Sequence, residues 1–172
     1  LNGVMRLEIY GRTRMPYATG EPTAEQISAV MEDFITLEGP LLPMLHGLQA
    51  EFGYVPQAAV ELIAEALNLS KAEVHGVISF YHDFRKAPAG RHVVKICRAE
   101  ACQAVGGEAL GEAVLAKLGL DWHGTTRNGA VTLEPVYCLG LCACAPAAMV
   151  DGKVIGRVTE DRMTRILQEA GA

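Results

Sequence analysis

Two cysteine pairs constrain the fold of this chain more than any other feature. Cys97 and Cys102 form one pair with C-x4-C spacing, and Cys138 and Cys142 form a second with C-x3-C spacing. Each pair follows an apolar, strand-like run, and the residues between the pairs carry a helical pattern. This arrangement predicts two short chelating loops at the ends of strands in one sheet. We therefore expect a metal site where the two loops meet.

Composition limits the compartment and the partners. Five cysteines are an odd number, so a full disulfide framework would leave one thiol over, and paired cysteines in a reducing compartment more often bind metal or do redox work. No apolar stretch approaches the roughly 20 residues that span a bilayer, and the N-terminal residues lack the order of a signal peptide. A net charge of −5 disfavours nucleic acid as a partner. We expect a cytoplasmic protein without membrane insertion.

The first half of the chain has the pattern of a small helical bundle. Thr23 and Gln26 form a capping box, and Ser70 and Glu73 form another, so a helix is expected to begin at each. Gly53 suits a left-handed helix end, and the proline that follows at position 56 suits the first turn of a third helix. With a further helix ending at residue 52, the pattern predicts about four short helices.

The second half alternates between strand and helix. Asp151-Gly152 is a strong hairpin signal, Thr159 can cap a last helix, and Pro135 indicates a bulge or an edge strand. The helix after the first cysteine pair is expected to begin at Gln103, with its positive end toward the metal site. The expected elements are strand 92–96, helix 106–118, strand 130–137, hairpin strands 147–150 and 153–156, and helix 160–169.

The order β-α-β-β-α matches a small thioredoxin-like α/β sheet. The predicted domain organisation is therefore an N-terminal extension (1–22), a helical bundle that serves in docking (23–87) and a thioredoxin-like α/β domain (88–172).

The cysteines alone leave two kinds of metal centre open. A [2Fe–2S] cluster takes two thiolates on each iron, which would place Cys97 and Cys102 on one iron and Cys138 and Cys142 on the other. A structural zinc ion takes the same four ligands at the same spacings, as in a redox-silent interaction module. Cys144 is interpreted as a small buried thiol, with a role as substitute ligand as the alternative.

Other candidate sites are weaker. Gly106-Gly107 fits no phosphate-binding pattern and is interpreted as a helix start or a packing position. The chain has no Ser/His/Asp arrangement, and we predict no catalytic residue.

Three further motifs accompany the cysteine loops. They are Phe52-Gly-Tyr-Val-Pro56, Glu73-Val-His-Gly-Val77 with Ser79-Phe-Tyr81, and Ala145-Pro146. Together with the cysteines, they resemble the thioredoxin-like [2Fe–2S] subunits of NADH-oxidising complexes. These include the 24 kDa (E) subunit of respiratory complex I, the diaphorase subunit of NAD-linked hydrogenases and the gamma subunit of soluble NAD-dependent formate dehydrogenases. The resemblance runs from about residue 23 to the last residue.

The resemblance implies a function as well as a fold. It implies that Cys97, Cys102, Cys138 and Cys142 ligate a [2Fe–2S] cluster, which favours iron–sulfur over zinc. It also implies a non-catalytic electron-transfer subunit whose cluster lies beside the FMN of an NAD-binding flavoprotein, against which the helical bundle docks.

Within the family, residues 97–103 and 79–85 look most similar to the formate dehydrogenase gamma subunit. Formate would then be oxidised at a molybdenum cofactor in a larger subunit that carries further iron–sulfur clusters. The equivalent subunit of complex I or of a hydrogenase is the alternative.

Overall fold

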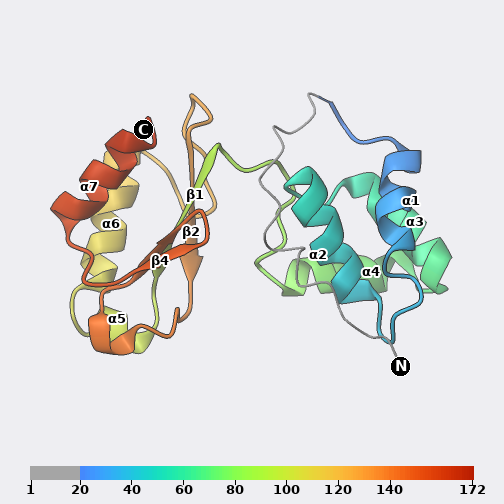
Figure 1. The fold of residues 1–172 in the computed structure, drawn as a ribbon, viewed down its shortest axis with the longest axis horizontal. Coiled ribbons are helices and arrows are strands. Elements are labelled where there is room, and N and C mark those ends of the chain that lie inside the picture. The colour runs from blue at the N-terminus through green and yellow to red at the C-terminus, as the bar shows by residue number, and fades with distance from the viewer. Residues whose placement is uncertain (1–19) are drawn as a thin grey trace. The chain divides into compact units, whose positions relative to one another are not determined.

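The computed structural model describes residues 20–172 and divides the chain into two compact units, with the boundary between Pro88 and Ala89 (Figure 1). The predicted extension 1–22 lies outside the described residues except at its end. We describe each unit by itself.

The first unit is a bundle of four short helices, as the sequence predicts. Its elements are α1 (Ala24–Glu32), α2 (Leu41–Phe52), α3 (Gln57–Leu67) and α4 (Lys71–Phe80). Both capping boxes are present: Thr23 Oγ1 accepts from the Gln26 N–H at 3.3 Å, and Ser70 Oγ accepts from the Glu73 N–H at 3.1 Å. Gly53 ends α2 with a φ of 81°, because glycine adopts the left-handed region without strain. Pro56 precedes α3 as its N-cap and does not lie in its first turn.

The core of the helical unit is apolar and continues into the segment after α4. Its fully buried side chains include Ile27, Met44, Leu45, Leu48 and Ile63.

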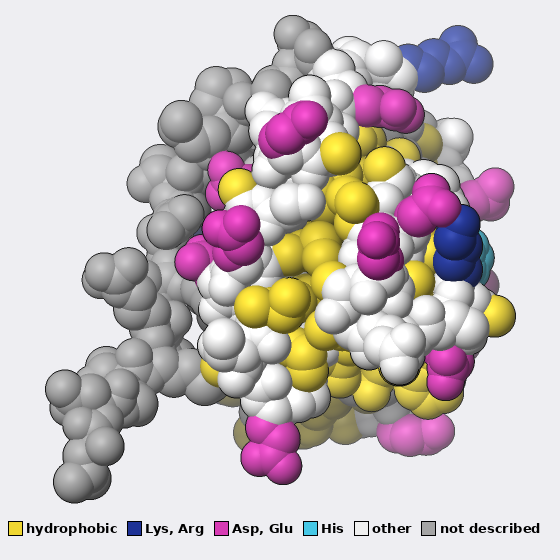
Figure 2. All heavy atoms as spheres, turned by 90° about the vertical axis from the view of Figure 1, so that its right-hand side faces the viewer, with side chains coloured by type: hydrophobic (Ala, Val, Ile, Leu, Met, Phe, Trp, Pro, Cys, Tyr) yellow, Lys and Arg dark blue, Asp and Glu magenta, His cyan; other side chains and the backbone are white. Residues whose placement is uncertain are grey.

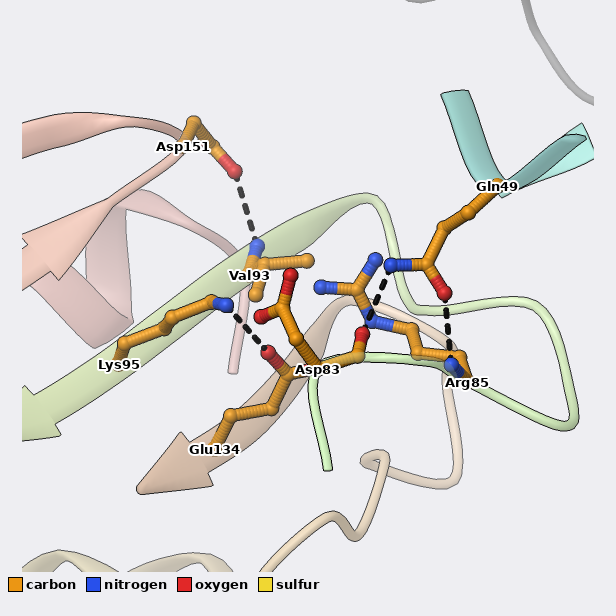
Figure 3. Close-up of polar contacts among 7 residues, drawn as sticks. All are labelled: Gln49, Asp83, Arg85, Val93, Lys95, Glu134 and Asp151. Atoms are coloured by element: carbon orange, nitrogen blue, oxygen red, sulfur yellow. Dashed lines mark hydrogen bonds and ion pairs between the residues drawn. The ribbon is translucent and has the colours of Figure 1, made fainter. Parts of the chain in front are cut away.

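A glutamine fastens that last segment to α2. Gln49 Nε2 donates to the Asp83 carbonyl at 2.7 Å, and Gln49 Oε1 accepts from the Arg85 N–H at 2.6 Å (Figure 3). Phe84, between these two contacts, packs its ring 4.9 Å from that of His46. His46 therefore has a packing role.

The second unit is a four-stranded sheet with helices, which confirms the predicted thioredoxin-like α/β fold. Its strands are β1 (His92–Cys97), β2 (Val131–Val136), β3 (Ala148–Val150) and β4 (Lys153–Ile155), in the order β2-β1-β3-β4. β1 runs parallel to β2 and antiparallel to β3. Its helical elements are α5 (Glu100–Gln103), α6 (Gly107–Leu118), the short 3-10 helix η2 (Cys142–Cys144) and α7 (Glu160–Glu169).

One face of the sheet packs against α6 and α7 (Figure 1). Val94 and Ile96 of β1 lie in that core with Leu133 of β2. Because side chains alternate along a strand, Val93, Lys95 and Cys97 lie on the opposite face.

Local signals placed most of these elements correctly. Asp151 and Gly152 have φ values of 48° and 84°, the positive pair that a tight hairpin requires, and Thr159 Oγ1 accepts from the Arg162 N–H at the start of α7. Pro135 lies in an edge strand with continuous register and no bulge.

The expected helix start at Gln103 is wrong. Gln103 instead ends the short helix α5, and α6 begins at Gly107. The inference that a helix beginning at Gln103 directs its dipole at the metal site therefore fails.

Among residues 20–172, no helix is both long enough and apolar enough to cross a membrane.

Candidate metal centre

The first cysteine pair lies at the buried end of β1. Cys97 is the last residue of the strand, and its N–H donates to the carbonyl of Ala147 at 3.0 Å. The next N–H, that of Arg98, donates to the carbonyl of Val136 at 2.8 Å, so Cys97 is fixed between its two neighbours in the sheet. Cys102 lies on α5, and both thiol residues are 2% exposed.

Two glycines hold α6 close against Cys102. Gly106 is the N-cap of α6 with a φ of 91°, and Gly107 is the first residue of the helix. A Cβ atom on Gly107 would lie 2.6 Å from the carbonyl oxygen of Cys102 and 2.8 Å from its carbonyl carbon. Both roles expected for this glycine pair, helix start and close packing, are confirmed.

The second cysteine pair lies on an exposed loop with unusual backbone geometry. Cys138 has a φ of 98°, a conformation that costs a non-glycine residue about 1–3 kcal/mol. Gly140 has a φ of 76°, and its N–H donates to Cys138 Sγ at 3.4 Å. Cys142 follows as the first residue of η2. Strain of this kind persists where the loop has to present particular groups, here a thiol and the N–H groups around it.

Each pair has its two sulfur atoms in contact. Cys138 Sγ and Cys142 Sγ are 3.8 Å apart. For a metal–sulfur bond of about 2.3 Å, two ligands of a tetrahedron are about 3.8 Å apart, so this pair can chelate one metal ion as it stands. The thiols of Cys97 and Cys102 are likewise in hydrogen-bond contact.

The fold brings the two pairs to one place. Burial raises the pKa of the Cys97 thiol, but hydrogen-bond contacts outweigh this effect, so the pKa lies below its ordinary value. The contacts come from the Cys102 thiol and from the backbone N–H groups of Ala99, Cys138 and Leu139. Two of these N–H donors belong to the second loop. Backbone donors around a sulfur stabilise the thiolate, which is the form that binds metal.

The thiols of Cys102 and Cys142 resist ionisation, chiefly because of burial at Cys102 and of contact with a neighbouring cysteine at Cys142. Burial and the contact with Cys97 raise the pKa of Cys102, and the negative charges of Cys97 and Cys142 add to that effect. The contact with Cys138 and its charge raise the pKa of Cys142. A set of thiolates so close together requires a cationic group to balance it. The donor set therefore fits a metal centre held by sulfur.

The described residues hold no group of three or more Cys, His, Asp or Glu side chains placed around a single ion position. The thiol–thiol contacts lie within each pair. Two close pairs match a two-iron cluster, in which each iron takes two of the four thiolates.

Cys144 has a packing role. It is half-buried, less so than the sequence suggested, and its carbonyl accepts from the Arg157 N–H at 2.6 Å. A Cβ on Gly156 would lie 2.8 Å from the Cβ of Cys144, so the side chain lies directly on the backbone of the segment after β4.

Comparison with known proteins shows the class to which the chain belongs. Residues 25–171 match the family model of the thioredoxin-like [2Fe–2S] ferredoxins. The chain belongs to this family of iron–sulfur electron-transfer proteins, as the resemblance of its motifs implied.

Individual relatives agree with that family. The chain is 32% identical over 149 residues to the NADP-reducing hydrogenase subunit HndA of Solidesulfovibrio fructosivorans, covering 87% of both chains. It is 30% identical over 151 residues to the E subunit of the NADH-quinone oxidoreductase of Escherichia coli K12, covering 86% of this chain and 91% of that one.

A crystal structure of an NAD⁺-reducing [NiFe]-hydrogenase shares the fold, with a TM-score of 0.63 at 23% identity. The match covers 76% of this chain and spans 22% of that much longer chain.

Sequence reasoning missed several residues that shape the site. The helix-favouring residues around Cys102 could have predicted the short helix α5. The positive φ of Cys138 and the burial of Lys95 beside Glu134 had no local signal, because both depend on how the strands and loops meet.

Proposed function

We propose that this chain holds a [2Fe–2S] cluster through Cys97, Cys102, Cys138 and Cys142 and serves as the electron-transfer subunit of a multisubunit NAD-linked oxidoreductase. The observation that carries the proposal is the convergence of two close thiol pairs on one place in a member of the [2Fe–2S] ferredoxin family. Such a cluster takes up and returns one electron at a time.

The chain's own residues set the conditions for that chemistry. The N–H groups of Ala99, Cys138 and Leu139 surround Cys97 Sγ and stabilise negative charge on it. Donors to cluster sulfurs favour the more negative, reduced form and so raise the reduction potential. Cys97 and Cys102 are buried while Cys138 and Cys142 are exposed, so the site faces the surface on one side only. An electron partner would approach from the Cys138 side.

The relatives support membership of a larger complex that reacts with a nicotinamide cofactor. The two named above are a subunit of an NADP-reducing hydrogenase and a subunit of an NADH-quinone oxidoreductase. We propose that this chain likewise assembles with a subunit that binds FMN and NAD, with the cluster beside the flavin.

The helical unit has a surface suited to docking that partner. Figure 2 shows apolar side chains gathered in a hollow, with acidic side chains around them. The hollow between α1 and α3 is lined by the apolar side chains of Met31, Ile35 and Leu62 and by the acidic side chains of Glu32 and Glu65. Phe80, at the end of α4, is 73% exposed. Apolar surface of this kind supports the proposed docking role of residues 23–87.

The proposed parent complex is an NAD-dependent formate dehydrogenase. The support is the similarity of residues 97–103 and 79–85 to the gamma subunit of that enzyme. Formate would be oxidised at a molybdenum cofactor in a larger subunit with further iron–sulfur clusters, and this subunit would have no catalytic residue of its own. Complex I and an NAD-linked hydrogenase are the competing assignments.

Purification of the tagged chain together with its native partners distinguishes the three. We expect a flavoprotein and a molybdenum-containing subunit to copurify, and we expect NAD⁺ reduction with formate. Reduction with hydrogen, or NADH oxidation coupled to quinone, would assign the chain to one of the competing complexes. A chain that contains zinc and no iron would contradict the electron-transfer function itself.

A further inference from the structure

A buried ion pair lies on the same face of the sheet as Cys97. Lys95 Nζ and Glu134 Oε2 are 3.2 Å apart, and the two residues are direct partners in the register of β1 and β2 (Figure 3). The next residues on that face are Cys97 in β1 and Val136 in β2, which are themselves register partners. The ion pair thus lies one pleat away from a cysteine of the proposed centre.

The surroundings of the pair are poor in water. The side chain of Lys95 is 14% exposed and that of Glu134 is 7% exposed. On the other side of Lys95, its register partner in β3 is Met149, an apolar residue. Because water screens charges weakly in such a place, each charge acts on its neighbours over a longer distance than a surface charge does.

The stability of the fold does not by itself explain why a buried ion pair occupies this position. Taking two charges out of water costs about as much as their attraction returns, and an apolar pair of similar size is often as stable. The redox chemistry next to the pair offers a reason, because a cluster becomes more negative when it takes up an electron. A positive charge nearby stabilises the reduced form, and a negative charge nearby stabilises the oxidised form.

We propose that Lys95 and Glu134 tune the reduction potential of the cluster held by Cys97, with Lys95 raising it and Glu134 lowering it. The inference rests on the proposed function, because it requires the cluster. Neither residue ligates the cluster; both act through their charge.

The opposite signs of the two charges give the proposal a distinctive test. Lys95→Met changes the net charge by −1 and lowers the potential, whereas Glu134→Gln changes it by +1 and raises the potential. At an effective permittivity of about 20, a unit charge acting over about 12 Å changes a one-electron equilibrium about tenfold, or about 59 mV, and a shorter distance gives a larger shift. The double variant Lys95→Met/Glu134→Gln should lie close to the wild type.

The measurement is a redox titration of the full chain with its cluster, followed by visible absorbance and by EPR. Lys95→Arg keeps the charge and should leave the potential unchanged. Lys153→Met, an exposed charge change on β4, is the matched control and should produce little shift. The EPR line shape of each variant shows whether the cluster itself is intact.

The outcomes separate this inference from the proposed function. Single variants that retain the cluster and share the wild-type potential, or that shift it in the same direction, would overturn the tuning role while leaving the cluster assignment intact. Should Lys95→Met not fold, the Glu134→Gln shift and the unchanged Lys95→Arg potential still decide the question. A wild-type chain without any cluster would overturn both.

Discussion

Replacing Gly107 by alanine should loosen the cluster more than it loosens the fold. The new Cβ would lie 2.6 Å from the carbonyl oxygen of Cys102, and real Cβ atoms essentially never approach closer than 3.0 Å. The backbone of Cys102 must therefore move by about 0.4 Å, the difference between these two distances. No flexible side chain can absorb the contact, because both of the nearest atoms belong to that backbone.

Two effects of the substitution on the stability of the fold oppose each other. Gly107 is the first residue of α6 and does not have a positive φ, so alanine should gain about 0.5–1 kcal/mol of helix stability. Overpacking of a close contact costs about 1–3 kcal/mol. The net loss in free energy of unfolding is therefore about 0–2.5 kcal/mol. A ligand site tolerates displacements of only about 0.2 Å, so the movement of Cys102 should weaken its bond to iron.

Two measurements separate the effects. Trp122 is the only tryptophan of the chain and lies against Gly111 of α6, so its fluorescence during urea unfolding reports on the second unit. The decay of visible absorbance in the presence of an iron chelator reports on the cluster. Gly76→Ala is the control, because the same methyl group in α4 meets no atom within 4 Å.

We expect Gly107→Ala to lose its cluster several-fold faster than both the wild type and Gly76→Ala. If Gly107→Ala retains its cluster as long as the wild type, the close approach of α6 does not position Cys102 and the reasoning is wrong.

Three further perturbations have defined outcomes. Cys138→Ser should lose or distort the cluster, whereas Cys144→Ser should leave its visible spectrum intact; loss in the second variant would show that the proposed ligand set is incorrect. Leu48→Ala removes a fully buried side chain and should destabilise the helical unit by about 2–5 kcal/mol, as followed by circular dichroism. The visible spectrum of the cluster should stay unchanged, and a concurrent loss of the cluster would contradict the proposed domain division. The backbone N–H and the hydroxyl of Ser70 lower the pKa of Glu73 from 4.5, so the ionised carboxylate stabilises α4 above pH 4.5 and this stabilisation is lost as the pH falls through the lowered pKa. Glu73→Gln should therefore reduce the loss of stability of the helical unit as the pH falls below 4.5. A variant with the same pH dependence as the wild type would refute the role of this carboxylate.

Where a few neighbouring residues determine a conformation, the sequence was sufficient to predict the structure. The capping boxes at Thr23 and Ser70 begin helices where expected, and Asp151-Gly152 forms the hairpin turn. The apolar periodicity identified the four helices of the first unit and the strands of the second. The paired cysteines and their motifs were sufficient to identify the family.

Features that depend on distant contacts were beyond sequence reasoning. Cys138 adopts a positive φ although cysteine has no preference for it, because its loop closes against Cys97. Lys95 and Glu134 meet only because β1 and β2 pair in one particular register. The helix start placed at Gln103 was wrong because Gln103 ends α5, whereas the helix expected over 106–118 is present as α6 with Gly106 as its N-cap.

The most direct test of the central claim is the visible and EPR spectrum of the purified full chain, with iron, sulfide and zinc measured on the same sample. The account predicts broad absorbance between roughly 400 and 600 nm that bleaches with dithionite, a rhombic EPR signal after reduction, and about two irons and two sulfides per chain. A colourless chain with one zinc ion bound by the same four cysteines would contradict it.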